Sequence, residues 1–415
     1  MCSDSLDTQK SKSAAATRVQ LANKWNSSQI ALPRWTLNIR QDLSGDGAIG
    51  VLLFHKLSEN RGEIRMVNYS PILRWKQGER SALSNLSPAG RANVIPLIVV
   101  SQLSYGDTKP PKAPPKTPPK NAPLSAPDAF VKQVRDAWGN GKIFIDVSDL
   151  PGTPAFHHLD NIRASANAAG LTLVPSVKYL APPAYHSAVT RMIAADNRGA
   201  ALRVTLNEMT NLANLVGNWY CPIAQTDLIV DLGGSVGTAL ALGAATRTVF
   251  QNLHQAQAWR SVTVAGGNIP ATLTGYLVGQ TMLARAELDL WQALVAHPVG
   301  YVLHFGDYAT VGPDASTDNI PGPVPINAKY TPHGQFQIFH GVKTKGPGSV
   351  PRDVQYRSYA ASIVALPQRV PLPVCWGDQT IDAIAGVPGT SAGSPATWVA
   401  YGINRHIELT RSQLP

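Results

Sequence analysis

The segment KIFIDVS (142–148), followed by a helical pattern and then by LTLVPSVKY (171–179), decides the fold. Both outer segments are nearly continuous apolar runs rich in β-branched residues, which is typical of parallel strands covered on both faces. The segment between them, TPAFHHLDNIRASANAAG, ends on Gly170, a residue that commonly terminates helices. A strand, a helix and a second strand in this order predict a parallel βαβ unit.

The same alternation extends along the chain in both directions. Six more strand candidates are 66–75, 93–100, 200–206, 226–233, 259–267 and 300–307, and helical patterns fill most of the gaps. A (β/α)8 TIM-like barrel has eight strands that alternate with helices, so we expect an α/β protein of that class. The alternative is a doubly wound open sheet, which normally carries a Gly-rich phosphate turn after an early strand. DLGGSVG, after the sixth strand, does not match that turn.

Three segments flank or interrupt the expected barrel, which spans 63–370. Residues 1–62 are expected to form an N-terminal extension with a helical stretch and a short strand pair. Residues 308–351 separate the eighth strand from a helix at 352–366, and they include a further strand candidate, GQFQIFHG. Residues 371–415 contain two strand-like pieces, TWVAYGI and RHIELTR, and are expected to form a C-terminal β appendage packed on the barrel.

The segment GDTKPPKAPPKTPPKNAPLSAP (106–127) repeats Pro-Pro-Lys and has no hydrophobic periodicity. Such a tract usually links two domains, but it follows the second expected strand and precedes the second expected helix. A boundary there would separate two strands from the barrel. We therefore predict that residues 108–123 are a proline-rich insertion in that strand–helix loop. In polyproline II conformation it would extend far across the barrel mouth, as a lid, a polyanion guide or a docking arm.

Composition narrows the class of protein. A hydrophobic content of 44% with 15% charged residues indicates a globular protein, and the net charge of +10 suits a polyanionic or phosphate-bearing partner. The three cysteines lie far apart without a CxxC pair, which argues against a zinc or redox motif. No apolar run is long enough to span a membrane, and the first residues lack the apolar core of a signal peptide. We expect a cytoplasmic protein.

Candidate functional residues end the expected strands, because barrels of this class carry their active sites at the carboxyl ends of the strands. Asp146, Asp231 and Asp307 close the third, sixth and eighth strands and are expected to face one mouth. They could bind Mg²⁺ or Mn²⁺, or divide general acid and base roles. Lys76 and Glu79 are two further catalytic candidates. The four substrate-binding candidates are Lys178, Arg203, His304 and Tyr308. The structural alternative is that such residues cap helices or pair internally with Arg and Lys.

Several segments together resemble a known family. They are PILRWKQGER, VIPLI, FIDV, ALRVTL, DLIVDLG, WRSVTVAGGNIP, RAELDLW, GDYA, WGDQTID, ATWVAYG and NRHIEL. They resemble the beta-protein family of tailed phages and prophages, over residues 66 to 411. The chain departs from the family pattern at GGNIP and at NRH. The resemblance implies a phage- or prophage-associated, barrel-like protein, located in the host cytoplasm if phage-encoded, and it implies no particular reaction.

Two hypotheses about function remain open at this point. The first is a hydrolase, with or without a metal ion, that acts on a phosphate-bearing or nucleotide-like substrate through the strand-end carboxylates. The second is a non-catalytic protein that binds a host protein, a phage protein or nucleic acid through residues 108–123. The PxxP spacing and the lysines of that segment suit aromatic grooves and acidic surfaces.

Overall fold

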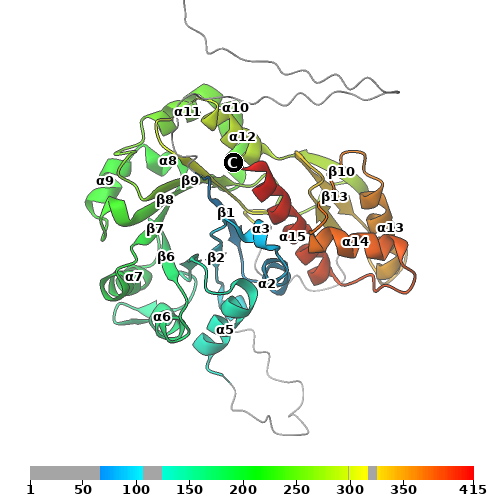
Figure 1. Ribbon diagram of the computed structural model, residues 1–415, viewed down its shortest axis with the longest axis horizontal. Helices are drawn as coiled ribbons and strands as arrows, with labels where there is room; N and C mark the ends of the chain where they lie inside the picture. The colour runs from blue at the N-terminus through cyan, green and yellow to red at the C-terminus, as the bar shows by residue number, and fades with distance from the viewer. Residues whose placement is uncertain (1–65, 106–123, 298, 316–324) are drawn as a thin grey trace, which may run out of the picture. The chain divides into compact units, whose positions relative to one another are not determined.

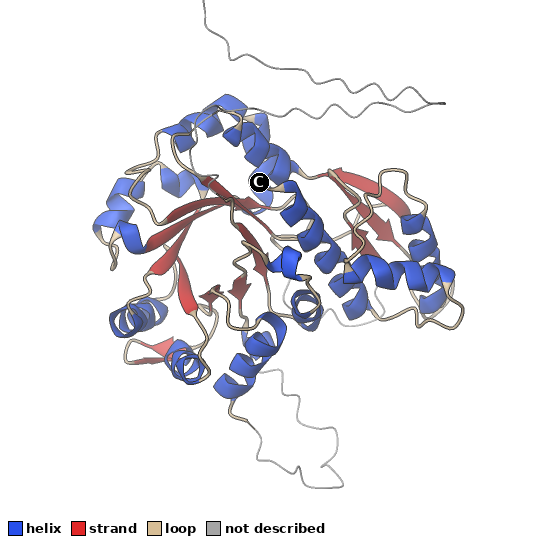
Figure 2. Ribbon diagram, viewed as in Figure 1, coloured by secondary structure: helices blue, strands red, loops and turns tan. Residues whose placement is uncertain are grey.

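The computed structural model describes residues 66–105, 124–297, 299–315 and 325–415, and Figures 1 and 2 show their ribbon. The expectations for residues 1–62 and 108–123 fall outside the described residues. Residues 106–123 lie between the helices α4 (Gln102–Tyr105) and α5 (Ala126–Trp138), after the barrel strand β2 (Leu97–Val99). The chain does not divide into separate units there.

Eight parallel strands close into a barrel, in the order β1-β11-β9-β8-β7-β6-β3-β2. The strands are β1 (Tyr69–Leu73), β2 (Leu97–Val99), β3 (Ile143–Asp146), β6 (Leu173–Lys178), β7 (Ala200–Val204), β8 (Thr226–Asp231), β9 (Ser261–Gly266) and β11 (Leu303–Asp307). Each lies within one of the segments that the sequence predicts. The TIM-like fold is therefore confirmed, and the open doubly wound sheet is excluded.

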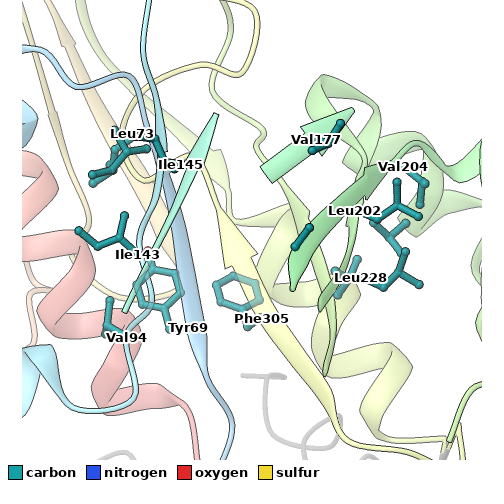
Figure 3. Packing of buried hydrophobic residues seen from close by; sticks show 14 of the residues in the cluster. Tyr69, Leu73, Val94, Ile143, Ile145, Val177, Leu202, Val204, Leu228 and Phe305 are labelled. Atoms are coloured by element: carbon teal, nitrogen blue, oxygen red, sulfur yellow. The ribbon is translucent and has the colours of Figure 1, made fainter. Parts of the chain in front are cut away.

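The strands are apolar on both sides because each side meets a different core. On β3, Phe144 packs inside the barrel, whereas Ile143 and Ile145 belong to the core between the strands and the outer helices. This alternation follows from the two-residue period of a strand. At the seam where β1 meets β11, the rings of Tyr69 and Phe305 stack in the outer core, with centroids 5.7 Å apart (Figure 3).

Helices cover the outer wall of the barrel (Figure 2). The longer ones are α2 (Gln77–Ser84), α5 (Ala126–Trp138), α6 (His158–Ala168), α7 (Pro183–Asp196), α11 (Gly243–Gln251), α12 (Ala286–Val295) and α15 (Pro395–Gln413). The shorter ones are α3 (Pro88–Arg91), α4 (Gln102–Tyr105), α8 (Leu206–Met209), α9 (Leu212–Gly217) and α10 (Val236–Ala241), with 3₁₀ turns η1 (Ile223–Gln225) and η2 (Gly233–Ser235). A small hairpin of β4 (Gly152–Thr153) and β5 (Phe156–His157) precedes α6.

The helix beside the seam is α15, near the end of the sequence. The segments TWVAYGI and RHIELTR, expected as strands, both lie inside this helix, so that expectation was wrong. Ser394 caps its first turn and Pro395 follows, a combination that starts helices. Ile403 and Ile407, one helical turn apart, then pack into the core of the barrel. Figure 1 shows α15 in red between the barrel and the strands β10 and β13.

A smaller layer beside α15 has its own core. An antiparallel sheet in the order β10 (Gly279–Ala284), β13 (Gln335–His340), β12 (Asn327–Tyr330) packs with α13 (Arg352–Val364) and α14 (Trp376–Gly386). The strand predicted at GQFQIFHG is β13. The strands of this layer therefore come from the loops after β9 and β11 and not from residues 371–415, and the helix expected at 352–366 lies in this layer.

Among the described residues, no helix combines the length and the apolar character needed to cross a lipid bilayer.

Gly199 offers a test of the backbone at the start of β7. Its φ is +66°, and a Cβ there would lie 1.9 Å from the carbonyl oxygen of Gln225. We expect Gly199→Ala to destabilise the protein by about 2 kcal/mol, because backbone strain and a clash add. Gly170→Ala is the matched control, since its φ is +70° but its Cβ would meet nothing within 4 Å. Urea unfolding should show a clearly smaller loss for the control, and equal losses would contradict the clash.

Candidate active site at the mouth of the barrel

A cavity of about 980 Å³ opens at the carboxyl ends of β6, β7 and β8. Its volume lies at the upper end of the range of small-molecule sites, and its position is that of the active sites of TIM barrels. The polar residues that line it are Lys178, Arg203, Thr205, Asn207, Glu208, Asp231, Ser235, Thr238, Tyr308 and Asp314. The structure therefore brings four of the predicted site residues, Lys178, Arg203, Asp231 and Tyr308, to one cavity.

Arg203 links two of the strand-end carboxylates. Its Nη1 donates to Oδ2 of Asp146 at 2.9 Å, and its Nη2 donates to Oδ2 of Asp231 at 2.6 Å. Arg203 is only 3% exposed. Burial by itself lowers the pKa of this guanidinium, but the neighbouring carboxylates and Tyr308 raise it above its ordinary range. The guanidinium is therefore a fixed positive charge inside the barrel.

The two carboxylates differ in their access to the cavity. The side chain of Asp146 is 2% exposed, and its other oxygen accepts the N–H of Ser148 at 3.1 Å. The side chain of Asp231 is 12% exposed and lines the cavity, while its Oδ1 accepts the N–H of Gly233 at 3.0 Å. Asp231 is thus the carboxylate that a bound molecule could reach, and Asp146 holds Arg203 from behind.

Tyr308 completes the group. Its hydroxyl donates to Oδ2 of Asp231 at 2.7 Å, and Nη2 of Arg203 lies 3.4 Å from the same hydroxyl. Burial and the Asp231 carboxylate raise the pKa of the Tyr308 phenol, so it stays protonated. Burial alone would raise the pKa of Asp231, but Arg203 and Tyr308 hold it below its usual value. An ionised carboxylate beside a neutral hydroxyl can accept a proton and return it.

A metal ion does not fit these residues. The described residues contain no group of three or more His, Cys, Asp or Glu side chains that could hold one. Asp146 and Asp231 direct their oxygens at the Arg203 guanidinium, which supplies the positive charge that Mg²⁺ or Mn²⁺ would supply. The expected metal site at Asp146, Asp231 and Asp307 is therefore not formed.

Asp307 does not share the mouth, contrary to the expectation. Its Oδ1 accepts the hydroxyl of Tyr69 at 2.7 Å, and its Oδ2 contacts Nε2 of His406 on α15 at 2.7 Å. The guanidinium of Arg285 lies 3.8 Å from Oδ2. All three partners are buried in the layer outside the barrel. Asp307 faces outward because it is one residue from Tyr308, and neighbouring strand residues point to opposite faces.

Lys76 and Glu79 lie at the end of β1, but they do not line the large cavity. Oε2 of Glu79 accepts the N–H of Lys76 at 2.8 Å, which caps the first turn of α2. Glu79 is 2% exposed, and burial raises the pKa of its carboxyl. Both residues line a second cavity, of about 180 Å³, next to β12. The structure thus gives Glu79 a capping contact and places both residues beside another site.

His304 and Lys178 lie at opposite ends of the barrel. Nδ1 of His304 accepts the N–H of Asn68 at 3.0 Å, and the ring lines a shallow cavity with Arg260 at the amino ends of the strands. Burial lowers the pKa of His304. Lys178 is exposed at the carboxyl end of β6, where it pairs in register with Arg203. Only Lys178 is therefore placed to contact a molecule at the mouth.

Several polar residues of the mouth were not predicted from the sequence, among them Asn207, Glu208, Ser235 and Asp314. Each lies a few residues after the end of one of the strands that carry the predicted site residues. Oε2 of Glu208 accepts the N–H of Thr205 at 2.7 Å, which is the capping box of α8. The Thr-x-x-Glu spacing was a readable signal for this cap.

The sequence matches a known protein family. The model of the Beta protein family matches residues 69–410, from the first strand of the barrel to the last turns of α15. No curated protein matches the chain. Because the family model covers most of the sequence, the chain belongs to the Beta protein family.

Proposed function

We propose that this protein is a phage- or prophage-associated hydrolase that acts on a small, phosphate-bearing or nucleotide-like substrate at the mouth of the barrel. The observation that carries the proposal is the cavity-facing carboxylate of Asp231, which is held by the buried guanidinium of Arg203 and by the hydroxyl of Tyr308. No metal ion takes part in the proposed reaction.

The charges of the cavity favour a small substrate over a polyanion. Its lining carries two cations, Lys178 and Arg203, and three carboxylates, Glu208, Asp231 and Asp314. A strand of nucleic acid would meet more negative than positive charge here. A molecule with one anionic group fits better, because Lys178 is exposed and can pair with that group as a point charge.

The proposed reaction uses the residues as they lie. Asp231, ionised at neutral pH, takes a proton from a water molecule, and the water oxygen attacks the phosphoryl or acyl centre. The bond to the leaving group breaks, and Asp231 returns the proton to the leaving oxygen, so that one water molecule is consumed. Tyr308 keeps Asp231 oriented and donates a hydrogen bond throughout. Asp146 is a positioning residue, because it acts through Arg203.

Asp231→Asn tests the proposal. With bis(4-nitrophenyl) phosphate and 4-nitrophenyl acetate as probes, we expect kcat/KM to fall about 100-fold, the usual contribution of a general base. Tyr308→Phe removes one hydroxyl and keeps both ion pairs of Arg203, and we expect a loss of about tenfold. The matched control is Asp196→Asn, since Asp196 pairs with Arg163 at 2.8 Å on the outer helices.

The control should keep the wild-type rate. Unchanged turnover in Asp231→Asn, or no turnover of either probe by the wild type, would contradict the proposal.

Deletion of residues 108–123 distinguishes the hydrolase proposal from the binding hypothesis. We expect the deletion to leave hydrolysis intact, whereas a purely binding protein would show no hydrolysis with or without it.

A further inference from the structure

A second cavity, of about 180 Å³, lies between the end of β1, the segment after β11 and the strand β12. Its charged lining residues are Arg74, Lys76, Glu79 and Lys329, and Trp398 of α15 forms part of its wall. Three of these four charged side chains are cationic. The cavity has room for several water molecules at about 30 Å³ each, and hence for a tetrahedral oxyanion.

Arg74 lines this cavity and has one donor nitrogen without a partner among the described residues. Its Nη2 donates to the carbonyl oxygens of Gly312, at 2.9 Å, and of Pro313. Its Nη1 is buried and has no hydrogen-bond partner among the described residues. A buried guanidinium nitrogen without an acceptor is unfavourable, so the site lacks an acceptor that a ligand would supply.

Lys329 is a second cation beside this cavity. Within the described part of the chain, its ammonium makes no hydrogen bond or ion pair. Burial, and next the charge of Arg74, lower the pKa of Lys329 to about 8. No carboxylate counteracts these two effects. Two cations that repel each other beside a cavity favour the binding of an anion between them.

Glu79 offsets only part of this positive charge, because its carboxylate interacts with Arg74 and Lys76. Its carboxylate accepts the N–H of Lys76 and is committed to the cap of α2. Glu79 has no effect on the pKa of Lys329, which responds to Arg74. The net charge around the cavity therefore remains positive.

We propose that this cavity binds a small oxyanion, a phosphate, sulfate or carboxylate group, between the guanidinium of Arg74 and the ammonium of Lys329. The site is distinct from the barrel mouth and does not depend on the hydrolase proposal. The two are nevertheless connected, because Arg74 holds the carbonyl of Pro313, and Pro313 also lines the mouth. An anion bound to Arg74 would thus lie next to the segment around Pro313, and the same segment borders the large cavity at the barrel mouth.

Sulfate is the test ligand, because its charge does not change between pH 7 and 9. Calorimetric titration of the full chain at constant ionic strength should show saturable binding at pH 7. The affinity should fall about tenfold by pH 9, because only the protonated Lys329 pairs with the anion and each pH unit above its pKa costs a factor of ten. Chloride at the same ionic strength should not compete.

Lys329→Met should abolish the binding. The variant should be no less stable than the wild type without sulfate, because it removes a half-buried charge that has no hydrogen bond or ion pair among the described residues. If Lys329→Met does not fold, Lys329→Gln is the substitute variant, and it should also lose sulfate binding. Lys132→Met is the matched control, since Lys132 is an exposed lysine paired with Asp136 on α5, and it should bind sulfate like the wild type. Failure of the wild type to bind sulfate, or equal binding by Lys329→Met and Lys132→Met, would overturn the proposal.

Discussion

Arg203→Met is expected to destabilise the protein by about 3–5 kcal/mol at neutral pH, the cost of leaving a buried charge without its partner. Asp146 and Asp231 would both lose the cation that lies between them, at 2.9 and 2.6 Å. Methionine keeps much of the volume of the arginine side chain, so the loss reflects charge more than packing. Urea unfolding of the wild type and the variant at pH 7 measures it.

The pH dependence of this loss has a definite sign. In the wild type the pKa of Asp231 lies below 3.8, so its contribution is present above that value and is lost as the pH falls through the folded pKa. Without Arg203, burial raises the pKa of Asp231, and the carboxyl is destabilising when it ionises. The difference in unfolding free energy between wild type and variant should therefore narrow as the pH falls from 7 towards 4.

A triple variant, Asp146→Asn, Asp231→Asn and Arg203→Met, should regain part of the stability that Arg203→Met loses. A loss below about 1 kcal/mol in Arg203→Met would mean that water replaces the guanidinium at little cost.

Glu287→Gln is expected to stabilise the protein at alkaline pH by about 2–4 kcal/mol. Glu287 is 3% exposed, and its Oε2 has no hydrogen-bond partner among the described residues. Burial is the main cause that raises its pKa from 4.5 to about 8, and the Asp307 carboxylate adds to it, while Arg285, at 3.4 Å, opposes both. The folded protein thus holds a proton that the unfolded chain has released.

This difference in bound protons fixes how the stability contribution of Glu287 changes with pH. The folded-state pKa is above the unfolded value, so the contribution of Glu287 to the stability of the wild type is largest below pH 4.5 and falls as the pH rises to about 8. Glutamine cannot ionise, and the variant should lack this decline. Unfolding free energies at pH 5 and pH 9 should differ more in the wild type than in the variant. Glu208→Gln, at a less buried carboxylate, is the control, and an equal change in both variants would contradict the assignment to Glu287.

The barrel could be predicted from the sequence because its strands carry a strong local signal. Segments such as KIFIDVS are largely apolar and rich in β-branched residues, and helical patterns follow most of them. The C-terminal helix was missed because TWVAYGI and RHIELTR are rich in β-branched and aromatic residues, which favour strands. The Ser394–Pro395 start signal was present, but it competes with that composition. Packing of Ile403 and Ile407 against the barrel then decides for the helix.

The candidate site was predictable only in part. Asp146, Arg203 and Asp231 all point inward, so placing them at strand ends was sufficient to bring them together. Asp307 required the exact register of β11, because a shift of one residue exchanges the inner and outer faces. The ion pairs themselves could not be derived, since they depend on distances across three strands. Whether a metal ion or Arg203 is the cation between the carboxylates could not be decided from the sequence either.

The helix α15 ties together parts of the chain that are very distant in sequence. The N–H of Ser87 donates to Glu408 across 321 residues, and Tyr69 donates to Asp307 across 238. Contacts of such long range have a high entropic cost of loop closure and form late in folding. During synthesis, the first strand and helix must therefore remain without their final partners until nearly all of the described chain has been made. The ring of Tyr69 has no stacking partner until Phe305 has been made, so this edge of the barrel is prone to aggregation while the chain is being synthesised.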